Sequence, residues 1–195
     1  FGLIHKASLL VDYCEADIWV GRHQVENVDL AHDIPVEWIN RIRVVPGVVD
    51  AAPYIVGSGV ASLPNGGFEP VWIIGIDPAS RMGGAWNIVD GGENYLYRPD
   101  SIAIDRLDAR KLGYVQNDDV IEINGHRAKV MGFTEGLMGF MTTPYAFTSL
   151  DSAHEYSGIR DVYCSYFLVK VADGVDVEPV SYTNLRADET GRHRR

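Results

Sequence analysis

The segment "VYCSYFLVKV", residues 162–171, constrains the fold more than any other part of the chain. Its β-branched and aromatic residues are typical of a strand with buried side chains. A predicted helix precedes this strand and a polar tail follows it, so no neighbouring strand is available for pairing. The strand must therefore return to a partner far back in the sequence, and we expect that partner to lie around Ile18 or Ile74.

The first third of the chain predicts a strand, a helix and a hairpin. Residues 16–21 are typical of a strand, and the next apolar segment has helical spacing up to Val45, with Asp33 as the expected N-cap and Pro35 in the first turn. Residues 48–63 and 68–76 form two strands around "PNGG". Because the first of them contains a proline and two glycines, we expect it to be an edge or bulged strand.

The middle of the chain begins with a segment rich in glycine, residues 77–100, which we interpret as a crossing between two lobes. A short strand over 101–104 follows it. Asp105 and Asp108 then resemble a capping box for a helix through Leu112, with Gly113 as the residue that ends this helix.

The clearest local pattern is a hairpin over residues 119–134. Alternating apolar residues flank Asn124 and Gly125, the residue types that tolerate the positive φ angles of a type I′ turn. Further on, Ser149 is placed to cap a helix over residues 150–156.

Strands mixed with a few helices, in no regular βαβ order, predict an α+β fold. The late return of the strand at 162–171 indicates that one lobe is inserted into another. We assign residues 16–78 and 160–172 to the first lobe, residues 79–159 to the inserted lobe, and residues 173–195 to a polar tail.

Charge excludes one class of partner. The net charge is −10 with a pI near 4.9, and the one basic cluster lies at residues 192–195. A nucleic-acid-binding protein needs a basic surface along the phosphate backbone, so we expect no nucleic-acid partner.

The sequence contains no pattern that predicts catalysis, a cofactor or a metal site. The six histidines are scattered without the spacing of metal ligands, and no phosphate-binding glycine loop or serine nucleophile motif occurs. Cys14 and Cys164 lie in apolar surroundings, which favours two buried free thiols, although a disulfide between them stays possible. We therefore expect a non-catalytic protein.

The segment 134–149 carries more apolar side chains than an ordinary loop. Tyr145 and Phe147 are predicted to be core residues. For Leu137, Met138, Phe140 and Met141, core packing and contact with a partner are both consistent with the pattern, because flexible methionines suit irregular contact surfaces.

No apolar stretch approaches the roughly 20 residues that cross a bilayer. The chain nevertheless opens with Phe1 rather than methionine, and apolar residues recur at helical spacing over the first 13 positions. We interpret it as a processed protein or a fragment, for which a preceding membrane helix is possible.

These segments, in this order, resemble a known family. "ADIWV" (16–20), "VPGVVDAAPY" (45–54), "VWIIGIDP" (71–78) and the segment 118–149 are similar to the MacB-like periplasmic core domain of FtsX-type ABC transporter permeases, and most similar to its DevC-like, glycolipid-exporting members. Two features depart from the family. Many relatives carry a basic residue where this chain has Met138, and the tail after residue 180 lacks the usual helix and strand.

The resemblance implies a porter-like lobe of βαβ type with an inserted small α/β lobe, on the periplasmic side of the inner membrane. Residues 1–15 would be the outer end of the first membrane helix of a multi-pass permease. Its implied partners are an ATPase subunit, a second permease copy or homologue, a periplasmic adaptor protein and, indirectly, an outer-membrane channel. The implied function is export of a lipid-like or hydrophobic substrate, with residues 137–141 touching the adaptor or the substrate.

Two other functions stay open from the sequence. An FtsX-type scaffold would use the same domain to activate a cell-wall hydrolase without moving a substrate. A periplasmic hydrolase would need a pocket in which two titratable groups converge.

Overall fold

The computed structural model describes residues 9–22, 28, 30–137 and 143–174. Four α- and 3-10 helical elements matter below: α2 (Leu9–Asp12), α3 (Ile39–Arg43), η2 (Gly92–Leu96) and α4 (Leu150–Ser157). Short 3-10 turns also occupy Val36–Trp38 and Asp108–Arg110. The strands are β1 (Ile18–Val20), β2 (Ile34–Pro35), β3 (Val48–Ser62), β4 (Phe68–Ile76), β5 (Ile88–Asp90), β6 (Ser101–Asp105), β7 (Val120–Ile123), β8 (His126–Thr134), β9 (Tyr145–Ser149), β10 (Tyr163–Cys164) and β11 (Tyr166–Val171).

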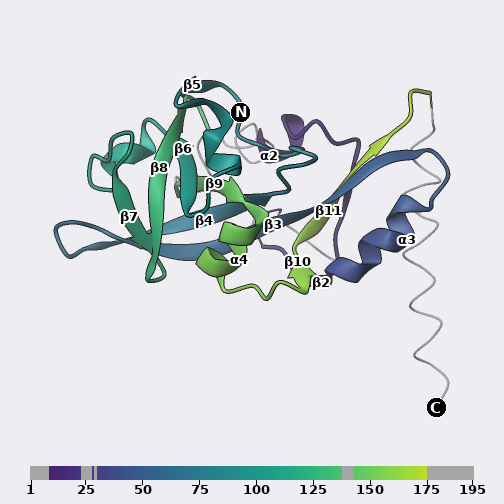
Figure 1. The fold of residues 1–195 in the computed structure, drawn as a ribbon, viewed down its shortest axis with the longest axis horizontal. Coiled ribbons are helices and arrows are strands. Elements are labelled where there is room, and N and C mark those ends of the chain that lie inside the picture. The colour runs from purple at the N-terminus through teal and green to yellow at the C-terminus, as the bar shows by residue number, and fades with distance from the viewer. Residues whose placement is uncertain (1–8, 23–27, 29, 138–142, 175–195) are drawn as a thin grey trace, which may run out of the picture.

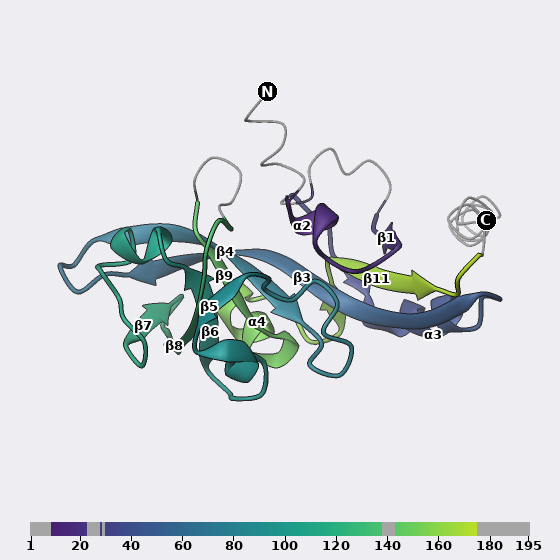
Figure 2. The same ribbon diagram turned by 90° about the horizontal axis from the view of Figure 1, so that it is seen from above.

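One mixed sheet organises the described residues. Its nine strands follow the order β1-β11-β3-β4-β9-β6-β8-β5, and β7 pairs with both β3 and β8. Strands β3 and β4 form the long central ribbon that runs through the molecule (Figure 1). Seen from above, α3 and α4 lie on one side of this ribbon and α2 lies on the other (Figure 2). The fold is therefore α+β, as expected.

The return of the last strand is confirmed. β11 lies between β1 and β3 and is antiparallel to both. Its Val169 pairs with Ile18, and its Leu168 pairs with Ala52. Two strands from the start of the chain are thus held together by one from its end.

Both predicted hairpins are present, and the second is tied to its surroundings by its turn. Asn124 and Gly125 have φ angles of 50° and 82°, as a type I′ turn requires. The Asn124 side chain accepts a hydrogen bond from Val60 N (3.0 Å) and donates one to Tyr156 O (2.7 Å). Ser149 caps α4 as predicted, accepting from Ser152 N.

Residues 48–63 were expected to form an edge or bulged strand. The edge alternative is wrong, because β3 has partners on both sides, whereas a bulge is present where the register of β3 against β11 shifts between Asp50 and Val48. The ladder between β3 and β4 begins at Tyr54, one residue after Pro53. Pro53, which has no N–H to donate, therefore removes no hydrogen bond from this ladder. The glycines provide space. A Cβ at Gly57 would collide with Ser157 of α4, and one at Gly59 would collide with Ile123.

Two predicted helices are much shorter than expected. Ile34 pairs with Cys164 in the β2–β10 ladder, which keeps the chain extended through Pro35, and Pro35 rather than Asp33 precedes the first turn. After β6, the Asp105 carboxylate accepts from Leu107 N, so the following turn is a single 3-10 turn and not a helix. Gly113 does adopt the predicted left-handed conformation, with φ of 91°.

The core consists of two clusters, one on each face of the sheet. One contains residues of α3 and α4, and the other contains Leu10, Cys14 and the residues of η2. Tyr145 and Phe147 are buried, as predicted. Cys14 and Cys164 are buried free thiols in opposite clusters. Among the residues that the structure describes, no helix has the length and hydrophobicity needed to cross a membrane.

The predicted division into lobes is not visible as a break in the sheet. β4, from the first predicted lobe, pairs in parallel with β9, from the inserted one, through Ile73 opposite Ala146 and its neighbours. The assignment of residues 16–78 with 160–172 and of residues 79–159 to separate lobes stays a prediction.

Replacing Gly75 by alanine should destabilise the fold. Its Cβ would meet the Cβ atoms of Ala153 on α4 and of Ile55 on β3. Since overpacking a tight contact costs roughly 1–3 kcal/mol, we expect urea unfolding to show a loss of that size for G75A. Adding A153G should restore part of the loss even though glycine disfavours a helix. An unchanged unfolding midpoint for G75A would contradict this packing.

Candidate functional site

The structure describes one of the four residues that were predicted to contact a partner. Leu137 is buried, with 1% of its surface exposed, in the cluster that contains Tyr145 and Phe147. Of the two possibilities that the sequence left open for Leu137, the structure shows core packing and not the predicted partner contact. Met138, Phe140 and Met141 lie outside the described residues.

The chain on either side of these three residues is held by buried hydrogen bonds. Leu137 N donates to Asp105 Oδ2 (2.7 Å), and the carboxylate of Asp105 is itself buried. On the other side, Pro144 O accepts from Trp72 N (2.8 Å) where β9 begins beside β4. Leu137 and Pro144, the described residues on either side, are therefore held at the sheet.

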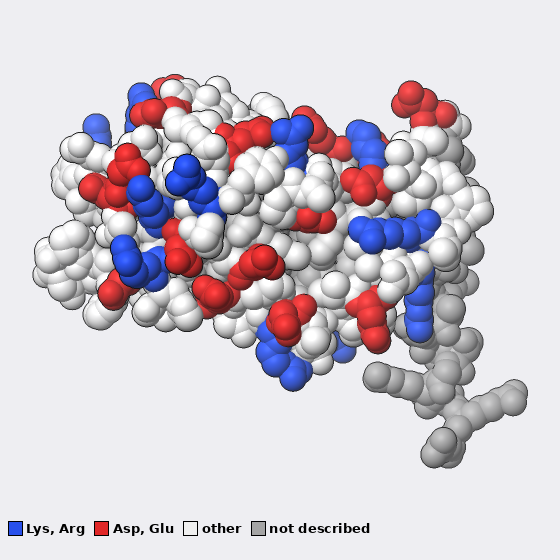
Figure 3. Space-filling model, in the orientation of Figure 1, with Lys and Arg blue, Asp and Glu red and all other residues white. Residues whose placement is uncertain are grey.

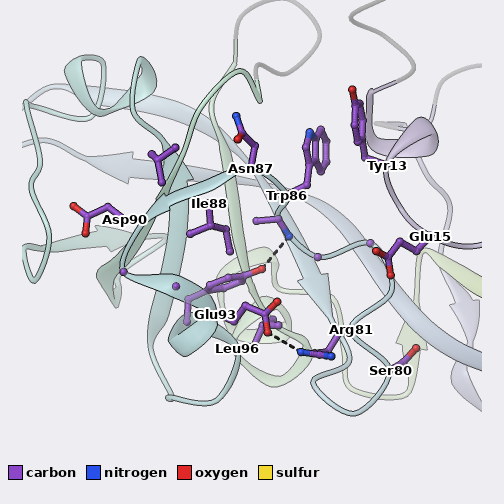
Figure 4. Close-up of a pocket in the computed structure, with 17 residues that line it drawn as sticks. Tyr13, Glu15, Ser80, Arg81, Trp86, Asn87, Ile88, Asp90, Glu93 and Leu96 are labelled. Carbon is purple, nitrogen blue, oxygen red and sulfur yellow. Dashed lines mark hydrogen bonds and ion pairs between the residues drawn. The ribbon is translucent and has the colours of Figure 1, made fainter.

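A pocket of about 670 Å³ lies beside this region (Figure 4). Its walls come from three parts of the chain: Tyr13 and Glu15 after α2, the crossing segment around Trp86 and Asn87, and η2 with Tyr95. Asn87 connects the wall to the segment described above. Its backbone oxygen accepts from Glu135 N (3.2 Å), and its side chain donates to Glu135 O (2.6 Å).

Aromatic rings join the pocket wall to the sheet. The rings of Tyr13 and Trp86 stack with centroids 4.8 Å apart and planes at 6°. Trp86 in turn meets Phe147 of β9 edge to face, with a centroid distance of 6.2 Å. Tyr13 is half exposed and Phe147 is fully buried. Below, "the N-terminal segment" means residues 9–20. Through Trp86, this segment is in continuous side-chain contact with β9 in the middle of the sheet.

Hydrogen bonds around Cys14 provide a second connection. Gly83 N donates to Cys14 O (2.9 Å), and the indole of Trp19 donates to Cys14 Sγ (2.9 Å). Tyr54 of β3 donates from its hydroxyl to Gly83 O (3.1 Å). Gly83 has φ of 73°, and a Cβ there would collide with the Tyr54 ring, so only glycine allows this close approach.

The end of the N-terminal segment is bound to β11. Asp17 N donates to Val169 O (2.9 Å), and Asp17 Oδ2 accepts from Val171 N (2.8 Å). Lys170 Nζ donates to Glu15 O (2.9 Å) and lies 3.7 Å from the Asp17 carboxylate. The N-terminal segment is therefore connected to the sheet along its length.

Two of the charged groups that line the pocket, Arg81 and Glu93, form an exposed ion pair. Arg81 donates to Glu93 at 2.8 Å, and this hydrogen bond raises the pKa of Arg81, which keeps its charge. Burial raises the pKa of Tyr95, so its hydroxyl stays neutral and accepts from Ala85 N (2.9 Å). Within the described residues, no group of three or more metal-ligating side chains could hold a metal ion.

Sequence reasoning missed this pocket. The segment 77–100 was expected to be a glycine-rich crossing between two lobes. In the structure it contains β5 and η2 and supplies most of the pocket wall. The one signal was local: two glycine pairs, 83–84 and 91–92, flank Trp86. Three of these glycines have positive φ angles and turn the chain around the cavity.

Comparisons with known proteins agree with this architecture. The structure resembles the extracellular domain of the ABC-type transporter YknZ from Gram-positive bacteria, with a TM-score of 0.62 and 17% identity over 89% of this chain and 93% of that one. It also resembles the periplasmic region of MacB from Actinobacillus actinomycetemcomitans, with a TM-score of 0.59 and 10% identity over 88% of this chain and 78% of that one. No curated protein matches the sequence significantly.

At these identities the structures establish the fold alone, and the narrower similarity to DevC-like permeases stays a prediction. The sequence itself is more specific, because residues 15–181 match the model of the MacB-like periplasmic core domain. The chain therefore belongs to the MacB-like family and is the periplasmic domain of an ABC transporter permease.

Proposed function

We propose that this domain transmits ATP-driven motion from the membrane to the periplasm during export of a lipid-like or hydrophobic substrate. Its role is mechanical and non-catalytic. The ATPase is a separate subunit, and the permease acts as a dimer. Motion enters through the N-terminal segment, which continues the first membrane helix, and leaves toward a periplasmic adaptor protein and an outer-membrane channel.

The observation that carries the proposal is the attachment of the N-terminal segment to the sheet. Strand pairing of β1 with β11, the bonds around Cys14 and the Tyr13–Trp86 stack act at different positions along that segment. A segment held at one point would pivot when pushed. A segment held along its length moves the whole sheet, because packed cores resist deformation.

The site at which the motion is passed on is inferred from the sequence pattern of Met138, Phe140 and Met141. We infer that these soft apolar side chains contact the adaptor or the substrate. Two facts support the inference: Leu137 and Pro144 are fixed to the sheet, and they carry the segment between them. Movement of the sheet would therefore move the contact residues with it.

A signalling scaffold is the second candidate, since it would need the same coupling. It would pass the motion to a cell-wall hydrolase and would move no substrate. Both candidate functions use the N-terminal segment, so the geometry does not distinguish them. Measuring substrate export and hydrolase activation does.

The first test removes the aromatic connection. In the full permease, Y13A should reduce export severalfold while the ATPase subunit remains active, because force is lost between the N-terminal segment and Trp86. An aromatic pair contributes about 0.5–1.5 kcal/mol, so the fold should survive. Y97A is the matched control, since Tyr97 is similarly exposed but takes no part in the stack. Equal export by Y13A, Y97A and the parent would contradict the coupling.

The second test concerns the contact residues. A variant with Met138, Phe140 and Met141 changed to serine should lose adaptor capture in pull-down assays and should lose export. Val120, a partly exposed apolar residue on β7, provides the control V120S. Normal capture and normal export would rule out the contact. Loss of hydrolase activation with no change in export would instead identify the signalling scaffold.

A further inference from the structure

Asp105 and Asp108 form a buried pair of carboxylates at the end of β6. Each has 1% of its surface exposed, and within the described residues no other charged side chain is buried. On the face drawn in Figure 3, by contrast, carboxylates lie at the surface among lysines and arginines. Because a buried charge is stable only when it is paired and hydrogen-bonded, the partners of these two groups determine their behaviour. Below, "the carboxylate pair" means Asp105 and Asp108.

The carboxylate of Asp105 is hydrogen-bonded through both oxygens. Its Oδ1 accepts from Leu107 N (2.9 Å), and its Oδ2 accepts from Leu137 N (2.7 Å). Thr134 Oγ1 lies 3.4 Å from the same Oδ2. One side chain thus joins the turn after β6, the end of β8 and Leu137.

The carboxylate of Asp108 is hydrogen-bonded through one oxygen. Its Oδ1 accepts from Lys111 Nζ (2.9 Å), and the lysine side chain is 34% exposed. Its Oδ2 is buried and has no hydrogen-bond partner among the described residues, in which no other buried side-chain nitrogen or oxygen lacks one. An unpaired buried oxygen costs more when the carboxyl group is charged than when it is neutral. The geometry therefore favours the protonated form of Asp108.

The charges around Asp108 act in the same direction. Burial is the main cause that raises the pKa of Asp108, and the negative charges of Asp105 and of Glu69 on β4 raise it further. Lys111, on the same turn, lowers the pKa but does not offset the effect of burial. Two further cations of this turn are exposed to solvent: Arg106 and Arg110.

We propose that Asp108 takes up a proton in mildly acidic surroundings and that this proton strengthens the attachment of Leu137 to the sheet. An ionised Asp108 repels Asp105, and the carboxylate of Asp105 cannot move away without weakening its bond to Leu137 N. Protonation removes the repulsion and leaves that bond intact. The carboxylate pair is thus a pH-sensitive anchor for the chain after β8.

The location of the domain gives such an anchor a role. The chain is a periplasmic domain of an inner-membrane permease family, and the cytoplasm does not control the pH on that side of the membrane. The anchor would therefore respond to the acidity outside the inner membrane. The proposal uses only contacts within the folded domain, and it does not rest on the coupling or the export proposed above.

The direction of the pKa shift fixes the effect on stability. Because the pKa of Asp108 is higher in the folded chain than in the unfolded one, its contribution to stability is complete below the unfolded pKa and is lost as the pH rises through the folded pKa. D108N keeps the shape of the neutral group and cannot ionise. It should therefore be more stable than the parent at neutral pH, and this advantage should shrink as the pH falls.

Three measurements on the purified chain test the proposal. NMR of the carboxyl carbons should show Asp108 titrating at a higher pH than exposed aspartates. Amide hydrogen exchange at Leu137, corrected for the intrinsic effect of pH, should slow severalfold from neutral to mildly acidic pH in the parent and should not respond in D108N. Urea unfolding should show the stability difference between D108N and the parent that is described above.

Asp118 provides the matched control. It also binds a lysine, with Lys129 Nζ at 2.6 Å, but its side chain is 70% exposed. D118N should therefore keep the pH response of the parent, both in the exchange at Leu137 and in urea unfolding.

Three results would overturn the proposal. The first is an Asp108 carboxyl group that titrates at or below the range of exposed aspartates. The second is exchange at Leu137 that does not respond to pH in the parent, or that responds equally in D108N. The third is a D108N variant that is less stable than the parent by the same amount at every pH, which would leave Asp108 a structural role alone. The first two are measured on the parent even if D108N does not fold. None of them depends on the export phenotype of Y13A, so the two proposals fail independently.

Discussion

The pairing of β11 between β1 and β3 is the interaction on which the rest of the structure depends. It joins the last described strand to the first one and to the central ribbon, and it buries Phe167, Leu168 and Val169 almost completely. A pairing over so long a sequence separation costs chain entropy that only extensive burial offsets. Without it, β1 would lack a sheet partner, and the N-terminal segment would be held by side chains alone.

Because of that pairing, the N-terminal segment is an integral part of the folded domain. β1 adds backbone hydrogen bonds, Cys14 adds bonds to the crossing segment, and Tyr13 adds ring contact with Trp86. The pocket lies where these connections meet. In the proposed mechanism, a force from the membrane side acts on the N-terminal segment. Because this segment is attached to the sheet at several positions, the force is transmitted to the whole sheet.

The sequence predicted the elements whose signals are local. The Asn124–Gly125 turn requires positive φ angles, and Ser149 caps its helix. The composition of residues 162–171 indicated a strand, which the structure divides into β10 and β11 in two different sheets. The errors arose where distant residues decide the conformation. Cys164 draws Ile34 into a ladder and shortens the predicted helix, and β4 stops pairing at Tyr54, which lets Pro53 sit in an interior strand.

The candidate site was less predictable, for the same reason. Leu137 belongs to an apolar run for which core packing and partner contact were both consistent with the sequence, and in the structure its backbone N–H is bound by the Asp105 carboxylate, 32 positions away. The pocket needs Tyr13 beside Trp86, a proximity that no local pattern encodes. Glycine pairs indicated a turn at this place but not that the turn encloses a cavity.

The central claim is that the N-terminal segment and the sheet move as one body. Spin labels at V11C on α2 and V60C on β3, both exposed positions, measure it directly in the assembled permease. The account predicts one narrow distance distribution by pulsed electron paramagnetic resonance, identical without nucleotide and with ATP bound. A distribution that shifts or broadens when ATP binds would show the segment sliding over the sheet, and would contradict the account.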